Sequence, residues 1–373
     1  MFSPRIFDGY MNKALKQLIS DVQHNCHISD AKFAGNYTLC VYLLKMREYY
    51  RWEKNSGFCL PLAQDEIGSW LTQREALWDN IEQEEYKALN IGGQAFNPFH
   101  SDAINEALKP SGLIYSGGYG VKSKPHFFIA EQEQLQKHLD YTIYISNKEY
   151  ARDLTSPPAM SHNKTIYIRR ESFKRLIWER TEEWRWNKPD NAMAKAIACY
   201  DFDNHLDDAL NSMTDNELNN AILHEIGEIQ AGEQLPNWQD MMNSISFTQA
   251  EIMARAVRDH LADALSTLPK LFGDSTRQSA RQNTQQASIH FYFANLTNMR
   301  KHLFPALFNA YQQWLKDDDI ETLYETASRG KQHWQTLANE ILRLFNTQNL
   351  KTEKTDSHHL ANNIETLVSN NHL

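Results

Sequence analysis

Residues 113–130 read LIYSGGYGVKSKPHFFIA, and this stretch decides the fold class of the chain. A short β-prone run, Leu113–Ser116, precedes a glycine-rich stretch, and a second run, His126–Ala130, follows it. This order predicts a β-hairpin with a long glycine-rich turn. The glycines do not lead from a strand into a helix, so they do not form the phosphate-binding loop of a dinucleotide fold.

Two further runs extend the predicted sheet. Residues 141–146 and 165–169 alternate aromatic and β-branched side chains, which is typical of strands. Strands this short need helices packed against them. We therefore predict an α+β fold that is predominantly α-helical, with helical bundle elements and a small antiparallel β-sheet inserted near residues 113–169.

The composition favours helices on both sides of the sheet. The 373 residues include 14 glycines and 11 prolines, well below the average usage of about 12% for these two residues together. We predict four parts, which are a helical N-terminal part over residues 1–110, the sheet over 111–170, a helical C-terminal part over 171–346 and a polar, disordered tail over 347–373.

The first long helix is predicted to begin at Ser29 or Asp30 and to continue to about Lys54. One face of this helix is apolar and consists of Phe33, Tyr37, Cys40, Val41 and Leu44. The run Met46–Glu53, which continues that face, is half charged. It forms either a buried Arg–Glu network that lines a pocket, or a part of the helix that has left the core with its arginine stems along the surface.

Two Thr-x-x-Glu capping boxes indicate where later helices begin. The first opens a helix at Thr214, and the second opens a helix at Thr248 that Pro269 is expected to stop. A long aromatic helix over residues 290–315 is expected to kink at Pro305.

The helix after Thr214 carries the residues that could perform chemistry. Glu225 lies on its apolar face, between Ile222 and Ile229, so we expect this carboxylate to be buried. A buried carboxylate needs an ion pair, hydrogen bonds or a metal. His224 and Glu228 are four residues apart and share a face, so the segment His224–Glu228 could bind a divalent metal such as Fe, Mn or Zn.

Other helices offer side chains that could complete such a metal site, and these are Glu48, Asp259, Asp263, His260 and His290. If they converge on His224, Glu225 and Glu228, the metal would act as a Lewis acid or a redox centre. The alternative is a non-enzymatic scaffold or regulatory protein, in which the same residues form structural ion pairs and the surface binds a protein partner or a second copy. The sequence names no substrate or reaction, so whether the chain is an enzyme stays open.

Charge and hydropathy exclude several classes of partner. The formal net charge is −9, so no global basic field attracts nucleic acid or anionic lipid. The longest apolar run, near residues 37–44, is shorter than the about 20 residues of a membrane-spanning helix. The N-terminus lacks the pattern of a signal peptide, and the four cysteines contain no CxxC pair, so we expect reduced thiols and a cytoplasmic protein.

Three of these segments, Met46–Glu53, Gly117–Ala130 and His224–Glu228, together resemble an uncharacterised bacterial protein family of unknown function. The resemblance covers most of the chain and implies no known activity. Helical di-iron carboxylate proteins pair ExxH motifs on facing helices, and this sequence departs from them because it has no clean ExxH pair.

Overall fold

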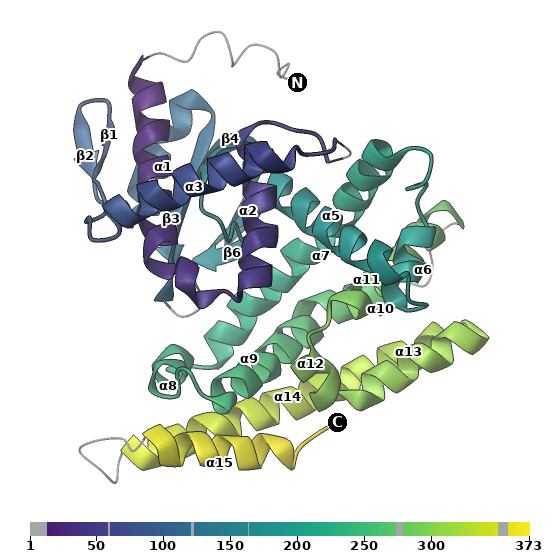
Figure 1. The fold of residues 1–373 in the computed structure, drawn as a ribbon. Coiled ribbons are helices and arrows are strands. Elements are labelled where there is room, and N and C mark those ends of the chain that lie inside the picture. The colour runs from purple at the N-terminus through teal and green to yellow at the C-terminus, as the bar shows by residue number, and fades with distance from the viewer. Residues whose placement is uncertain (1–12, 59, 121–122, 163, 274–278, 350–356) are drawn as a thin grey trace. The chain divides into compact units, whose positions relative to one another are not determined.

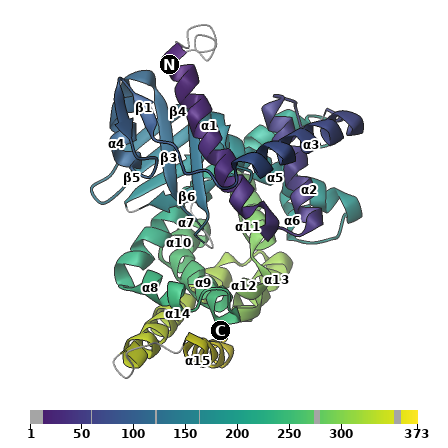
Figure 2. The same cartoon turned by 60° about the vertical axis from the view of Figure 1, so that its left-hand side comes forward.

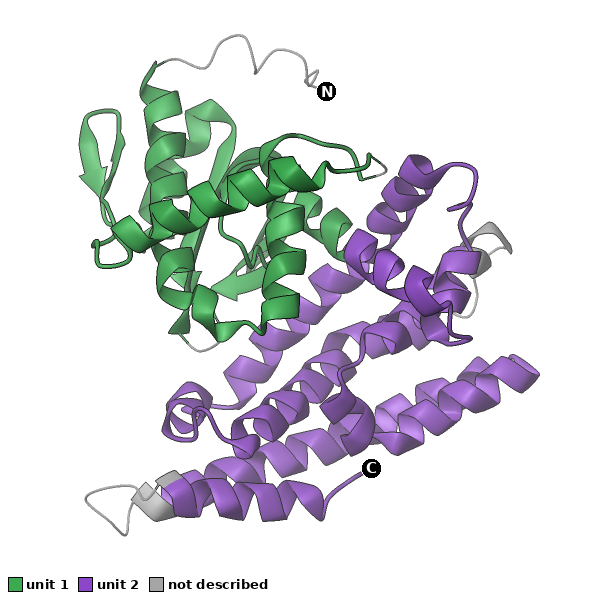
Figure 3. Ribbon diagram, in the orientation of Figure 1, with its two compact units in different colours: residues 1–176 green, residues 177–373 purple. Residues whose placement is uncertain are grey.

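The computed structural model describes residues 13–58, 60–120, 123–162, 164–273, 279–349 and 357–373 (Figure 1). The chain forms two compact units, Met1–Leu176 and Ile177–Leu373 (Figure 3). The fold is α+β and mainly helical, which confirms the predicted class. In the described parts, no helix is both long and apolar enough to span a membrane.

Unit 1 contains a five-stranded sheet with the order β3-β4-β5-β7-β6. The strands are β3 (Leu113–Tyr119), β4 (Pro125–Lys137), β5 (Thr142–Arg152), β6 (Ala159–His162) and β7 (Thr165–Arg169). The predicted β-prone block is therefore a real sheet. It is mixed rather than wholly antiparallel, because β6 and β7 form a short hairpin after β5 and bring β7 back parallel to β5.

Unit 1 also contains helices. They are α1 (Lys13–Phe33), α2 (Leu39–Glu53), α3 (Gln64–Ile81), α4 (Ser101–Leu108) and the start of α5 (Arg170–Asn187), with 3-10 turns at Ala34–Asn36 and Lys109–Ser111. Of these helices, α1 and α4 pack on the sheet. Figure 2 shows α1 lying across the sheet, where it packs on β4 and β5. A separate two-stranded hairpin consists of β1 (Leu89–Ile91) and β2 (Gln94–Phe96).

All regular secondary structure in the described residues of unit 2 is helical, and the unit has one large apolar core. Its helices are α6 (Ala192–Ala198), α7 (Leu206–Gln234), α8 (Trp238–Ser244), α9 (Gln249–Ala262), α10 (Leu268–Gly273), α11 (Ser279–Asn295), α12 (Asn298–Leu303), α13 (Pro305–Asp317), α14 (Ile320–Asn349) and α15 (Ser357–Ser369). A π turn, η4 (Asp263–Thr267), joins α9 to α10.

The predicted single helix from Ser29 to Lys54 is wrong, because the chain breaks between α1 and α2. Ser29 and Asp30 are buried inside α1 and do not cap a helix. Their side chains bond across to the sheet instead, where Ser29 Oγ donates to the carbonyl oxygen of Pro125 and Asp30 pairs with Lys124.

The later helix boundaries agree with the sequence only in part. Thr248 is confirmed as an N-cap, since its side chain accepts a hydrogen bond from the backbone N–H of Glu251. Thr214 instead lies inside α7, where its hydroxyl donates to the Leu210 carbonyl oxygen at 2.6 Å. Pro269 does not stop the helix, because the π turn before it leads directly into α10. Pro305 begins α13 after a break.

The end of the chain is folded over residues 357–373. α15 buries Leu360, Ile364 and Val368, which recur every four residues and pack into the core of unit 2. The prediction of a disordered tail is therefore wrong for α15, and residues 350–356 lie outside the described part of the chain.

Candidate functional site

The segment His224–Glu228 lies where α7 crosses the end of α9. A Cβ atom added at Gly227 would lie 2.1 Å from the carbonyl oxygen of Ala262, far inside van der Waals contact. Glycine at this position therefore lets the two backbones approach each other. The close crossing brings His224 and Glu228 to the residues at the end of α9 and in the π turn.

Asp263 is the centre of the polar contacts at this crossing. It opens the π turn, and its side chain is 1% exposed. Its carboxylate accepts hydrogen bonds from His224 Nδ1 at 2.7 Å, from the Tyr292 hydroxyl at 2.9 Å and from Arg300 Nη2. Arg300 Nη2 also donates to the Tyr292 hydroxyl at 3.1 Å. Three donors from three other helices thus converge on one buried carboxylate.

This environment keeps both members of the His224–Asp263 pair charged. Burial raises the pKa of the Asp263 carboxyl, but Arg300 and His224 outweigh burial and hold that pKa well below its ordinary value. Burial lowers the pKa of the His224 imidazole, but Asp263 outweighs it and raises the pKa to about 10. His224 is therefore an imidazolium at neutral pH, and it is not a free base.

Glu225 is buried, as predicted, with 8% of its surface exposed. Glu228 does not turn toward His224 to form a ligand pair, because its carboxylate forms an ion pair with Arg258 Nη2 at 2.7 Å. Glu228 therefore has an arginine partner on α9.

The other predicted ligands do not complete a metal site. His260 stacks on Trp334 with ring centroids 4.7 Å apart, and its Nε2 donates to the Arg300 carbonyl oxygen at 3.0 Å. His290 Nδ1 lies 2.9 Å from the Tyr311 hydroxyl. Asp259 is half-buried on α9. Across the residues that the structure describes, no group of three or more His, Cys, Asp or Glu side chains could bind a metal ion. Metal binding at His224, Glu225 and Glu228 is therefore not supported.

The remaining predicted ligand, Glu48, is buried in unit 1 in a different network. Its carboxylate accepts a hydrogen bond from Arg47 Nε at 2.8 Å and lies 3.3 Å from Arg51 Nε. Arg51 also donates to the carbonyl oxygens of Gly57 and Leu60. An Arg–Glu network around the buried Glu48 carboxylate is present, as in one interpretation of Met46–Glu53, while the pocket of that interpretation stays a prediction.

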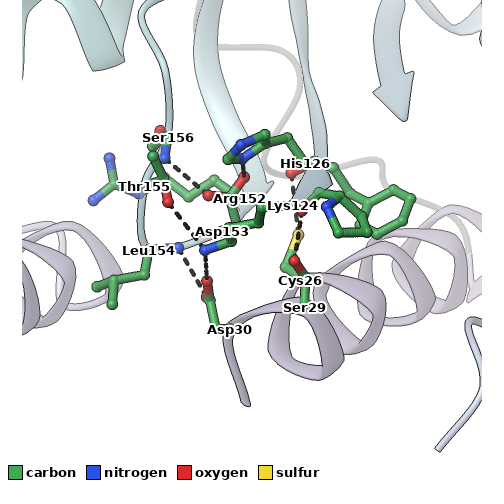
Figure 4. Close-up of polar contacts among 12 residues, drawn as sticks. Cys26, Ser29, Asp30, Lys124, His126, Arg152, Asp153, Leu154, Thr155 and Ser156 are labelled. Carbon is green, nitrogen blue, oxygen red and sulfur yellow. Dashed lines mark hydrogen bonds and ion pairs between the residues drawn. The ribbon is translucent and has the colours of Figure 1, made fainter. Parts of the chain in front are cut away.

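A second buried polar cluster of unit 1 had no signal in the sequence, because its members are far apart along the chain. Asp30 accepts hydrogen bonds from Lys124 Nζ at 2.9 Å and from the backbone N–H of Leu154 at 2.8 Å (Figure 4). His126 Nδ1 lies 3.2 Å from Asp153, whose other oxygen accepts the backbone N–H of Ser156 at 2.9 Å.

The charged groups of this cluster change one another's pKa. Burial raises the pKa of Asp30 to about 6, although Lys124 lowers it. Burial also lowers the pKa of the Lys124 ammonium, but Asp30 and Asp153 outweigh burial and raise it above its ordinary value. Lys124 is therefore a fixed ammonium ion whose charge stabilises the two carboxylates.

Side chains of unit 1 also accept backbone N–H groups at the end of β5 and just after it. β7 pairs with β5 only over Thr142–Ser146. Beyond that pairing, three backbone N–H groups donate to side chains. The N–H of Glu149 donates to Glu171 at 2.6 Å, that of Arg152 to Gln23 at 3.2 Å and that of Leu154 to Asp30.

One further surface was placed wrongly by sequence reasoning. The predicted core face at the start of α2 is exposed, whereas Met46, Tyr49 and Tyr50 at its other end pack beside Trp70. We call the exposed residues the α2 surface, and they are Leu39, Cys40, Val41, Leu43 and Leu44. The exposed fractions of the four aliphatic members are 70% for Leu39, 43% for Val41, 45% for Leu43 and 40% for Leu44.

Comparison with known proteins finds matches to two family models. The N-terminal domain of a family of unknown function (DUF6866) matches residues 17–169, and the C-terminal domain of the same family matches residues 174–367. No curated protein and no solved structure matches the chain.

Proposed function

The chain belongs to this family of unknown function, and we propose from its geometry that it acts by binding another protein through the α2 surface. The observation that carries this proposal is the exposure of four aliphatic side chains within six residues of one helix. Single exposed apolar residues are ordinary, but a contiguous apolar patch is typical of an interaction site.

The state of the buried charges supports a binding role over catalysis. Asp263, Glu228 and Asp30 each have a cationic partner within hydrogen-bonding distance. Such pairs stabilise a fold only if both partners stay in place. These residues therefore form structural ion pairs inside the protein. This is what the alternative hypothesis from the sequence, a non-enzymatic scaffold or regulatory protein, expects of them.

We also propose a cytoplasmic location. Cys26, Cys40 and Cys199 carry free thiols, and reduced cysteines are the rule in the cytosol. Cys40 belongs to the α2 surface and is exposed, so an oxidising compartment would leave a reactive thiol in the proposed interface.

Site-specific photo-cross-linking in the producing cells tests the binding proposal. A photoreactive amino acid replaces Leu43 in one version and Leu139 in another, because Leu139 is 99% exposed in the same unit but lies outside the α2 surface. We expect one dominant cross-linked protein from position 43 that is absent from position 139.

That protein is then purified and its affinity for the full chain is measured by calorimetry. Leu43→Glu should weaken the binding by about a hundredfold, as expected for an interface residue that costs more than 2 kcal/mol, while Leu139→Glu should leave it unchanged. Equal cross-linking from both positions, cross-links confined to the chain itself, or equal affinity of the two variants would overturn the proposal.

A further inference from the structure

We propose that protonation of Glu217 controls whether the first half of α11, residues 279–288, stays packed on α7. Both helices belong to unit 2, so this inference does not depend on the α2 surface. Its basis is the set of neutral partners around the Glu217 carboxylate and the polar attachment of the start of α11. The side chains of residues 279–283 lie outside the described part of the chain.

Glu217 lies inside α7 and is 1% exposed. Its carboxylate accepts hydrogen bonds from Ser288 Oγ on α11 at 2.8 Å, from Asn220 Nδ2 at 2.9 Å and from Asn216 Nδ2 at 3.1 Å. These three donors are neutral, whereas Asp263 in the same unit accepts from an arginine and an imidazolium. Neutral donors offset a buried negative charge less than cations do, so burial raises the pKa of Glu217 to about 7.

The start of α11 is attached to its neighbours through polar contacts. Asn216 Nδ2 donates to the Thr284 carbonyl oxygen at 3.1 Å, and Gln285 Nε2 donates to the Leu271 carbonyl oxygen on α10 at 2.8 Å. The second half of α11 differs, because it places apolar side chains such as Phe293 in the core of unit 2. A segment with fewer buried apolar contacts opens at a lower free energy than the core, so the first half of α11 can open by itself.

Ionisation of Glu217 favours this opening. In the packed state the carboxylate is buried and its pKa is about 7, whereas in an open, hydrated state the pKa returns to its ordinary value of 4.5. Because the packed pKa is the higher one, the packed state has its full stability below pH 4.5 and loses it as the pH rises through about 7. With these two pKa values, the ratio of open to packed molecules should rise about tenfold between pH 6 and pH 8.

In the described part of the chain, the titratable groups near Glu217 do not explain such a change. Burial and the Glu217 charge raise the pKa values of Cys199 and Tyr200, which follow α6, so both stay neutral between pH 6 and pH 8. On α11, burial lowers the pKa of His290 to about 4, so this imidazole is neutral too. On α7, the neighbouring acid Asp215 is exposed to solvent.

Hydrogen exchange of the full chain, measured by mass spectrometry from pH 6 to pH 8, tests this inference. After correction for the intrinsic exchange rate, peptides over residues 284–290 should show an opening constant that rises about tenfold over this interval. Because the opening is local, that constant should stay the same in about 1 M urea. Exchange over residues 337–342, in the core of α14, should instead speed up in urea, since it requires unfolding of a large surface.

Variants assign the pH dependence to one carboxylate. Glu217→Gln keeps a hydrogen-bonding amide but cannot titrate, so the tenfold rise should disappear. Glu233→Gln makes the same substitution at an exposed position of α7, and it should keep the rise. Ser288→Ala removes one donor to the carboxylate, so it should raise the pKa of Glu217 and extend the rise to higher pH. Circular dichroism and thermal unfolding check that each variant is folded.

An opening constant of α11 that does not depend on pH, or a rise that persists in Glu217→Gln, would overturn the inference. Equal sensitivity of α11 and α14 to urea would also overturn it, because α11 would then open only when the whole unit unfolds. None of these results decides the proposed function, because cross-linking from position 43 tests that function in unit 1.

Discussion

Replacing Gly227 by alanine tests whether the crossing of α7 and α9 builds the His224–Asp263 centre. The added Cβ would lie 2.1 Å from the Ala262 carbonyl oxygen and 2.7 Å from its carbonyl carbon. Side chains avoid contacts under about 3 Å, and a backbone carbonyl cannot rotate away as a side chain can. The two helices must therefore separate.

Two opposing terms set the magnitude. Alanine is favoured over glycine inside a helix by about 1 kcal/mol. The overlap costs about 1–3 kcal/mol or more, as in other overpacked cores, and loosening the His224–Asp263 pair adds to this cost because a buried charge loses part of its compensation. We expect Gly227→Ala to lower the free energy of unfolding by about 2 kcal/mol or more.

A matched control lies in the same helix. Gly232 is exposed on α7, and a Cβ added there would meet only Arg258 Nη2, at the ordinary contact distance of 3.9 Å. Gly232→Ala should therefore raise the stability by up to about 1 kcal/mol. Urea unfolding of both variants measures the difference, and an NMR titration should show the pKa of His224 falling below its value of about 10 in Gly227→Ala only. If Gly227→Ala were as stable as Gly232→Ala, the close crossing would be refuted.

Three further outcomes follow from buried charges. Asp263→Asn should lower the pKa of His224 from about 10 toward 6.5 in an NMR titration, because Asp263 is the largest of the charges that raise it, and a value that stays near 10 would contradict the pair. In the native protein the pKa of His224 is about 10, which is above the value of 6.5 for the unfolded chain. The contribution of His224 to the free energy of unfolding is therefore complete below pH 6.5 and is lost as the pH rises through about 10. Glu217 is buried in α7, and burial raises its pKa from 4.5 to about 7. Its contribution to the free energy of unfolding is therefore complete below pH 4.5 and is lost as the pH rises through about 7. Glu217→Gln, which keeps a hydrogen-bonding amide, should flatten the pH dependence of urea unfolding over that interval, and an unchanged slope would contradict the burial. Glu225→Ala should lower the free energy of unfolding by about 2–4 kcal/mol, because the buried partner of Glu225 loses its contact. A melting temperature within about a degree of the native value would instead show that the side chain is solvated.

The parts of the fold that could be predicted are those that local pattern determines. Alternation of side chains located the strands between residues 113 and 169, and helical periodicity placed Glu225 in the core. The parallel pairing of β5 with β7 has no local signal, because it depends on the short hairpin that reverses the chain between them. The sequence contains apolar residues at helical spacing in α15, at Leu360, Ile364 and Val368, but the polar residues around them led to the prediction of a disordered tail.

The error at α2 has a geometric cause. A helical wheel assigns one face to residues 33–44 only if they form a single helix. The chain instead breaks between Phe33 and Leu39, so the two helices have independent directions, and the apolar residues after the break need not face the core that receives those before it. This break is why Cys40, Val41 and Leu44, which were predicted to face the core, are exposed.

Some of the buried charges lie where the regular backbone ends, whereas Glu48 and Glu225 lie inside helices. Asp263 opens the π turn that interrupts α9 and α10, and it ties that turn to His224 and Arg300. Glu171 accepts the backbone N–H of Glu149 in β5, and Asp30 accepts that of Leu154, which follows β5. Backbone groups outside regular pairing need partners, and Asp30 and Glu171 supply them in unit 1, whereas Asp263 binds side-chain donors of unit 2. These acids thus have partners inside the chain, and the exposed apolar side chains of α2 are the basis on which we propose a partner from outside it.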